Sequence, residues 1–134
     1  MTANGLITIE SRYGPEETMN RFEAEVRASG MTVFAHIDHA AGATTVGLPL
    51  RPTELLVFGN AEAGTLLMQS VQTVGIDLPL KALAWQDAAG TAWLSYNDPA
   101  FLARRHGVES AENTTINAMA AALKAIAGKA TATS

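Results

Sequence analysis

The sequence predicts a single α+β domain with a mainly antiparallel sheet and its helices packed on one face. Strand-like and helix-like segments follow one another in the order β-α-β, then β-α-β-β, then two helices. Residues 87–90 form a short Gly-containing loop between two strands, which is typical of a hairpin. Hairpins and β-α-β units on one chain favour an antiparallel sheet, and ferredoxin-like and other curved-sheet arrangements both stay open. We assign the domain to residues 1–128 and expect a disordered tail at 129–134.

The first β-α unit has clear local signals. Residues 6–12 are predicted to form a strand, since Ile7 and Ile9 are in phase at period two. A helix follows, opened by Pro15 at its first position and ended by Gly30. Its buried stripe falls at helical spacing and consists of Met19, Phe22 and Val26.

Two further strands are predicted before the middle of the chain. Met31–His39 alternates, so Met31, Val33, Ala35 and Ile37 share one face and Thr32, Phe34, His36 and Asp38 the other. Residues 40–52 are a connection in which 44–48 could be a short strand or a helical turn. Glu54–Gly59 is apolar on both faces, which is typical of a central strand covered on both sides.

The second half begins with a helix from about Ala61 to Thr73, capped by Asn60 and stopped by Gly75. Leu80–Asp87 and Thr91–Asn97 are the hairpin strands. Asp98 and Pro99 give the strongest local signal, a cap followed by Pro at the first helical position, and that helix ends at Gly107. The last helix begins near residues 110–113, buries Ile116, Met119, Leu123 and Ile126, and ends at Gly128.

Composition excludes several classes of protein. Only 16% of the residues are charged, and 9 Lys and Arg against 13 Asp and Glu give a net charge of −4, which argues against a nucleic-acid partner. No cysteine is present, which excludes disulfides and thiolate metal sites. The first twenty residues lack the apolar core of a signal peptide, and no stretch approaches the ~20 apolar residues that span a bilayer. We therefore expect a soluble cytoplasmic protein without a membrane partner.

The densest group of acid–base side chains is His36-Ile37-Asp38-His39. Strand parity places His39 on the face opposite His36 and Asp38, which disfavours a three-ligand metal site, so we predict no metal and no cofactor. His39 would be a half-buried general base oriented by Asp38. The structural alternative is that Asp38 caps the following turn and His39 is a hydrogen-bonded residue at the edge of the core.

Two strand–helix turns offer further candidate ligand-binding residues. Asn60 lies in the turn from Gly59 to Thr65, where free N–H groups attract anions, although the turn matches no phosphate-binding motif. Asn97 and Asp98 form the other turn, where a simple helix cap is the alternative. His106 fits the end of a helix, and Trp85 and Trp93 fit a cross-strand pair in the hairpin.

Several ordered blocks resemble the family called domain of unknown function 302, over about residues 6 to 127. The blocks are Thr53–Asn60, Ala63–Gln69, Ile37–Ala41, Asp77–Lys81 and Trp93–Pro99. Two departures, at Ala61 and Leu66 where the family often has Pro, affect helix entry. The resemblance implies a two-layer α+β fold with a curved, mainly antiparallel sheet, similar to the TATA-binding-protein-like class, and a homodimer. It implies no settled activity and adds weight to Asp38, His39 and the Asn97–Pro99 turn.

These observations lead to a main functional prediction with two alternatives. We predict a homodimeric small-molecule binding or sensing domain, because an apolar chain with few charges leaves room for a pocket and an interface. Asp38, His39, Asn60, Asn97 and Asp98 are its candidate ligand-binding residues. The alternatives are an enzyme that uses His39 and Asp38 as an acid–base pair, and a structural or scaffolding protein.

Overall fold

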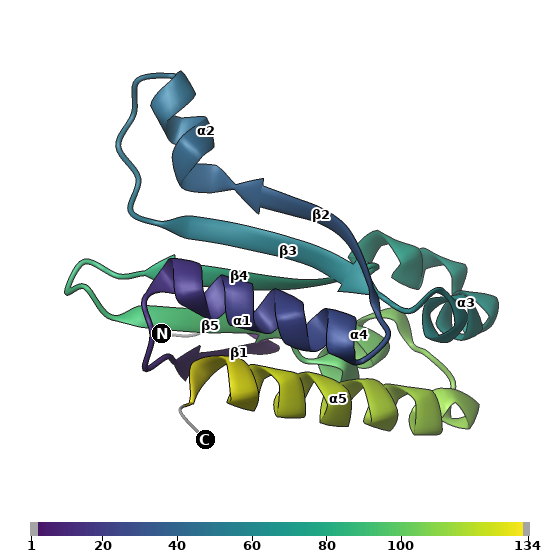
Figure 1. The fold of residues 1–134 in the computed structure, drawn as a ribbon. Helices are drawn as coiled ribbons and strands as arrows, with labels where there is room; N and C mark the ends of the chain where they lie inside the picture. The colour runs from purple at the N-terminus through teal and green to yellow at the C-terminus, as the bar shows by residue number, and fades with distance from the viewer. Residues whose placement is uncertain (1–2, 133–134) are drawn as a thin grey trace.

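One antiparallel sheet organises the computed structural model, which describes residues 3–132 (Figure 1). The strands pair in the order β1-β5-β4-β3-β2. They are β1 (Leu6–Glu10), β2 (Thr32–Asp38), β3 (Thr53–Gly59), β4 (Leu80–Gln86) and β5 (Ala92–Asn97). The helices are α1 (Pro15–Ala28), α2 (His39–Thr45), α3 (Ala61–Ser70), α4 (Pro99–His106) and α5 (Asn113–Thr131), with 3₁₀ turns η1 (Gln72–Asp77) and η2 (Ser110–Glu112).

The predicted antiparallel sheet with helices packed against it is confirmed. Helices α1 and α5 run side by side over one face of the sheet, and α4 packs against α5 (Figure 1). The ferredoxin-like alternative is wrong, because β1 is an edge strand here, whereas the first strand of a ferredoxin-like sheet lies inside it. Strands β2 to β5 instead form a simple meander, and β1 closes the sheet beside β5.

The core lies between the sheet and α1 and α5. Met19, Phe22 and Val26 of α1 are fully buried, as their helical spacing predicts. The ring of Phe22 meets that of Phe58 on β3 edge-to-face, with the centroids 5.3 Å apart. Burying a side chain of this size contributes about 1.5–3 kcal/mol, so this contact is a main link between α1 and the sheet.

A β-bulge in β2 changes the predicted faces of that strand. The pairing with β3 shifts between Val33 and Ala35, so Phe34 is the extra residue. Because one inserted residue reverses the alternation, His36 lies on the same face as Val33 and reaches α1. The prediction that His36 opposes Val33 is therefore wrong.

The second predicted strand also ends earlier than expected. It stops at Asp38, and His39 is the first residue of α2, exposed to solvent. The prediction of a half-buried His39 at a strand end is therefore wrong. The connection that the sequence left undecided contains this short helix, which projects from the body of the protein (Figure 1).

We call residues 39–52, with α2 in them, the arm. Residues 40–50 contain no charged side chain. Three large apolar side chains are nevertheless exposed there: Val46 (69%), Leu48 (62%) and Leu50 (50%). Such a segment is typical of a contact surface rather than of ordinary solvated surface.

Two helix ends differ from the prediction. Helix α3 stops at Ser70, and the chain continues as η1 past Gly75, so the single helix to Thr73 is wrong. Helix α5 continues through Gly128 to Thr131, because Ala130 and Thr131 are buried in the body of the domain. The expected tail from 129 is thus helical to Thr131, and residues 133–134 of that tail lie outside the described residues.

The second face of the sheet, here called the open face, is formed by the side chains that alternate with the core residues of β3, β4 and β5. On β4 these are Lys81, Leu83 and Trp85, which alternate with the buried Leu80, Ala82 and Ala84. Trp85 stacks on Trp93 of β5 with the ring centroids 6.2 Å apart, which confirms the predicted cross-strand pair. Thr8 and Ser95, 87 residues apart, share a 2.9 Å hydrogen bond across β1 and β5. The open face is completed by Leu55 and Val57 of β3.

Candidate functional site

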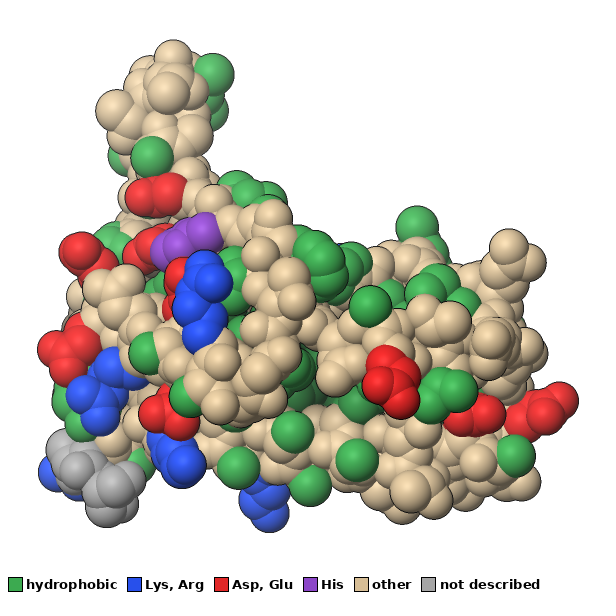
Figure 2. Space-filling model, turned by 45° about the vertical axis from the view of Figure 1, so that its right-hand side comes forward, with side chains coloured by type: hydrophobic (Ala, Val, Ile, Leu, Met, Phe, Trp, Pro, Cys, Tyr) green, Lys and Arg blue, Asp and Glu red, His purple; other side chains and the backbone are tan. Residues whose placement is uncertain are grey.

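A cavity of about 690 Å³ opens between α3, α5 and the adjoining ends of β2, β3 and β4. We call it the α3–α5 cavity. On the face shown in Figure 2, a hollow with hydrophobic side chains inside it separates two parts of the surface. Its lining comes from three stretches, residues 29–34, 59–80 and 114–123. A volume of this size lies within the range of small-molecule sites.

Local sequence explains why this space is left open. Strand β3 ends at Gly59, and Asn60 caps α3 by accepting a 3.1 Å hydrogen bond from the N–H of Ala63. Leu67, also on α3, does not line the cavity but packs in a second buried cluster with Val74 and Ile116. The walls of the cavity contain small residues where larger ones would fill it, namely Gly59, Gly64, Ala118 and Ala122.

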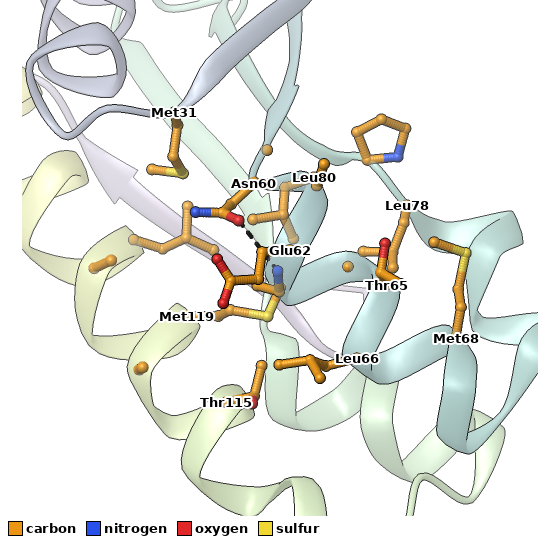
Figure 3. Close-up of a pocket in the computed structure, with 18 of the residues that line it drawn as sticks. Met31, Asn60, Glu62, Thr65, Leu66, Met68, Leu78, Leu80, Thr115 and Met119 are labelled. Carbon is orange, nitrogen blue, oxygen red and sulfur yellow. Dashed lines mark hydrogen bonds between the residues drawn. The ribbon is translucent and has the colours of Figure 1, made fainter.

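The walls of the cavity are apolar and adaptable. Three methionines line it from separate parts of the chain: Met31 just before β2, Met68 on α3 and Met119 on α5 (Figure 3). Phe34, placed by the bulge, and Leu66 add large apolar side chains that are exposed to solvent. Methionine side chains adjust to varied shapes, so this lining suits an apolar ligand better than a small ion.

The polar side chains that line the cavity are those of Ser29, Asn60, Glu62, Thr65, Thr114 and Thr115. The amide oxygen of Asn60 is engaged by Ala63, which leaves its NH₂ group as a donor. Glu62 extends from α3 beside Asn60 and Met119, and Thr115 lies on the α5 wall (Figure 3). Among the described residues that line this cavity there is no Lys, Arg or His, and Glu62 is the one charged group.

The five candidate residues from the sequence lie in three separate places. Only Asn60 lines the α3–α5 cavity. Asp38 and His39 lie at the base of the arm, where Asp38 Oδ1 accepts a 2.9 Å hydrogen bond from the N–H of Ala41. Within residues 3–132, no side chain pairs with the imidazole of His39. The predicted Asp38–His39 pair is therefore not brought into a cleft.

Asn97 and Asp98 lie at the junction of β5 and α4. Asp98 Oδ1 accepts a 3.0 Å hydrogen bond from the N–H of Ala100, which is the predicted cap, and Asn97 pairs with Leu6 of β1. The neighbouring residue on β5 is Tyr96. Burial of its phenol, together with the negative charge of Asp98, raises the pKa of Tyr96. This junction fixes the edge of the sheet and does not open into the α3–α5 cavity.

Two ionisable groupings were missed by sequence reasoning. His36 lies between two carboxylates, with Nδ1 3.3 Å from Glu23 and Nε2 2.6 Å from Glu54. His106 and Arg105 both contact Asp77. Each grouping joins elements far apart in sequence, so no local motif could have signalled it. Within residues 3–132, no group of three His, Cys, Asp or Glu side chains could hold a metal ion.

The architecture and the sequence together identify the family. The family model described as "Domain of unknown function DUF302" matches residues 7–126. The chain belongs to the DUF302 family. A crystal structure of an uncharacterized conserved DUF302 protein from Bacillus stearothermophilus has the same fold, with a TM-score of 0.83, 21% identity, and coverage of 96% of this chain and 99% of that one. At that identity the likeness concerns the fold alone.

Two curated relatives are more similar in sequence. The fluoride-specific ion channels FluC 1 of Brucella suis biovar 1 (strain 1330) and FluC 1 of Brucella abortus biovar 1 (strain 9-941) are each 50% identical over 116 residues, or 87% of this chain. The chain spans 46% and 43% of their respective lengths, less than half of each. Among residues 3–132, no helix combines the length and the apolar character that crossing a bilayer requires.

Proposed function

We propose that this DUF302 chain is a small-molecule binding or sensing domain whose ligand occupies the α3–α5 cavity. The observation that supports this most is the cavity itself, about 690 Å³ with apolar walls and a few polar groups at its edge. Ligand sites combine these two properties, since the apolar walls supply affinity and the polar groups fix orientation.

The experiment that tests this proposal fills the cavity. Phe in place of Ala118 on α5 would occupy the space, whereas Phe in place of Ala121, which is exposed on the same helix and does not line the cavity, serves as the control. We expect the neutral fluorescent probe N-phenylnaphthylamine to bind the unaltered protein and Ala121→Phe saturably and to lose its site in Ala118→Phe. Equal binding by both variants would contradict the proposal. Native mass spectrometry of protein from its own host then identifies the resident molecule.

We also propose that the chain forms a homodimer through the open face. Leu83 and Trp85 leave apolar surface on the side of the sheet that α1 and α5 do not cover. Five strands about 4.8 Å apart and about 20 Å long present roughly 500 Å² of flat surface. A stable interface takes about 800 Å² from each partner, which the side-chain relief and the neighbouring arm would supply. Light scattering should give a dimer mass, and Leu83→Glu should give a monomer; a monomeric unaltered protein contradicts the proposal.

The curated relatives support a second candidate function, a regulatory domain of an ion channel. The support is the 50% identity to proteins named as fluoride channels, in which the matched part is less than half of the length. The test compares fluoride flux in vesicles that contain the Brucella suis relative with and without its matched region. A regulatory domain changes the flux without abolishing it, whereas unchanged flux argues against this candidate.

The enzyme and scaffolding hypotheses have less support. An enzyme using His39 and Asp38 needs both groups in a cleft, but they lie exposed at the arm, and Asp38 is engaged as a helix cap. A scaffolding role has no observation in its favour beyond the exposed apolar arm. Both stay predictions, as does a cytoplasmic location.

A further inference from the structure

We infer that the ligand of the α3–α5 cavity is an amphiphilic amine, with an elongated apolar body in the cavity and a protonated nitrogen at the carboxylate of Glu62. This inference rests on the proposed binding function and names the chemical class of the ligand. It starts from the charge at the site: of the described residues that line the cavity, Glu62 alone is charged.

Among the residues that the structure describes, Glu62 has no cationic partner. The acidic side chains of the ion pairs formed within residues 3–132 are Glu17, Glu23, Glu25, Glu54 and Asp77, and Glu62 is not among them. Its side chain points across the space between α3 and α5, towards Met119 (Figure 3). Glu62 is exposed to solvent, so a cation that a ligand brings beside it gains a modest attraction, as in a surface ion pair.

The same geometry disfavours an anionic ligand. The beginning of α3 would attract an anion through its free N–H groups, but the side chain of Asn60 already engages the N–H of Ala63. The charge of Glu62 then repels a second carboxylate at short distance. A fatty acid is thus a poor fit to a cavity whose shape and apolar lining would otherwise suit it.

Two of the other polar side chains of the lining, those of Asn60 and Thr115, can add hydrogen bonds. The NH₂ of Asn60 is free to donate a hydrogen bond, and the hydroxyl of Thr115 on the opposite wall can donate or accept one. Met31 and Met119 lie near Glu62 and provide polarizable thioethers around an alkyl chain (Figure 3). An ammonium group has three donors, so a contact with Glu62 leaves two of them for water or another acceptor.

The test uses dodecylamine, dodecanol and dodecanoate below their aggregation concentrations, which share a chain and differ in head group. The proteins are the unaltered chain, Glu62→Gln, and the control Glu16→Gln, which removes an exposed first-turn acid of α1 outside the cavity. Calorimetry should give the affinity order amine, alcohol, carboxylate. Glu62→Gln should weaken amine binding about twofold to fivefold, as expected for an exposed ion pair, and leave the alcohol unchanged.

Each outcome decides between the inference and the function on which it rests. Suppose that the alcohol binds the unaltered protein but not Ala118→Phe, and that the amine binds no tighter than the alcohol. The inference is then wrong and the binding function stands. An amine preference that persists in Glu62→Gln also overturns the inference, because the cation then pairs elsewhere. If none of the three probes is affected by Ala118→Phe, the proposed binding function itself fails.

Discussion

The imidazole Nε2 of His106, at the end of α4, lies 2.6 Å from Oδ2 of Asp77, at the end of η1. Both side chains are largely shielded from water, with 9% and 15% of their surfaces exposed. Arg105 contacts the same oxygen at 2.7 Å, and Thr73 lies 3.3 Å from the other nitrogen of the ring. The contact between His106 and Asp77 joins η1, which borders the α3–α5 cavity, to α4. It should therefore stabilise the position of η1.

The first prediction concerns the pH dependence of Asp77. Burial raises the pKa of this carboxyl, but the hydrogen bond from His106 and the charge and hydrogen bond of Arg105 outweigh it and hold the pKa below its usual 3.8. A folded-state pKa below the unfolded one adds stability above the unfolded value, and this is lost as pH falls through the folded value. Asp77→Asn should therefore cost about 1–3 kcal/mol near pH 6, and progressively less as the pH falls below the unfolded-state value of 3.8. Urea unfolding at pH 6 and over a series of acid pH values checks this, and an equal cost throughout contradicts it.

The second prediction concerns Gly5, which has φ +74° and lies against the ring of Phe101. A Cβ added there would overlap Cγ of Phe101, so Gly5→Ala is strained by both backbone and contact. We expect a loss of at least about 2 kcal/mol in the free energy of unfolding.

Gly128→Ala is the control for this prediction. Gly128 lies within α5, and a Cβ added to it would meet no atom within 4 Å outside its own helix turn, so Ala should raise stability by about 0.5–1 kcal/mol. The two melting temperatures should thus move in opposite directions. A Gly5→Ala variant as stable as the unaltered protein would show that Phe101 moves aside at no cost.

The third prediction separates two helix caps of the same chemistry. Asp98 caps α4, which is packed against α5, so Asp98→Ala should lower global stability by about 1–2 kcal/mol. Asp38 caps α2 in the projecting arm, so Asp38→Ala should loosen α2 locally and leave global unfolding nearly unchanged. Hydrogen exchange at the amide of Ala41 reports the local effect, and Asp38→Asn, which keeps a capping oxygen, should largely restore its protection. A large global loss in Asp38→Ala would mean that the arm is part of the cooperative fold.

The fourth prediction concerns His39. Its side chain is exposed and has no partner within residues 3–132, so His39→Ala should change the free energy of unfolding by less than about 0.5 kcal/mol. If His39 instead serves a ligand, binding changes while stability does not. A fall of several degrees in melting temperature would show that the imidazole has a structural partner.

Local rules predicted much of the fold. The stripe of Met19, Phe22 and Val26, the hairpin around Gly90, and the Asp98–Pro99 cap follow from spacing and turn chemistry within a few residues. The bulge at Phe34 has no such signal, because it depends on how β2 pairs with β3. That one residue reversed the side of the sheet on which His36 lies. Alternation counted from the start of the strand therefore assigns the wrong face to the residues after the bulge.

The candidate site was predicted less well than the fold. Asn60 was found because a strand–helix turn is a local motif. The cavity is assembled from three distant stretches whose own patterns are those of ordinary strands and helices, and Glu62 resembles any acid in a first helical turn. The contact of His106 with Asp77 likewise joins residues 29 apart. Only tertiary packing reveals such sites.

The hydrogen bond between Thr8 and Ser95 has a consequence for how the chain folds. Strand β1 is made first during synthesis, but its partner β5 follows 87 residues later, after the rest of the sheet. Until then β1 is an unpaired apolar strand. The outer edge of a newly formed β5 likewise presents unpaired backbone N–H and C=O groups, to which another strand can bind. A second chain can offer its own β1 to that edge in the same register. Refolding at high concentration should therefore yield strand-exchanged dimers, whereas refolding at high dilution should not.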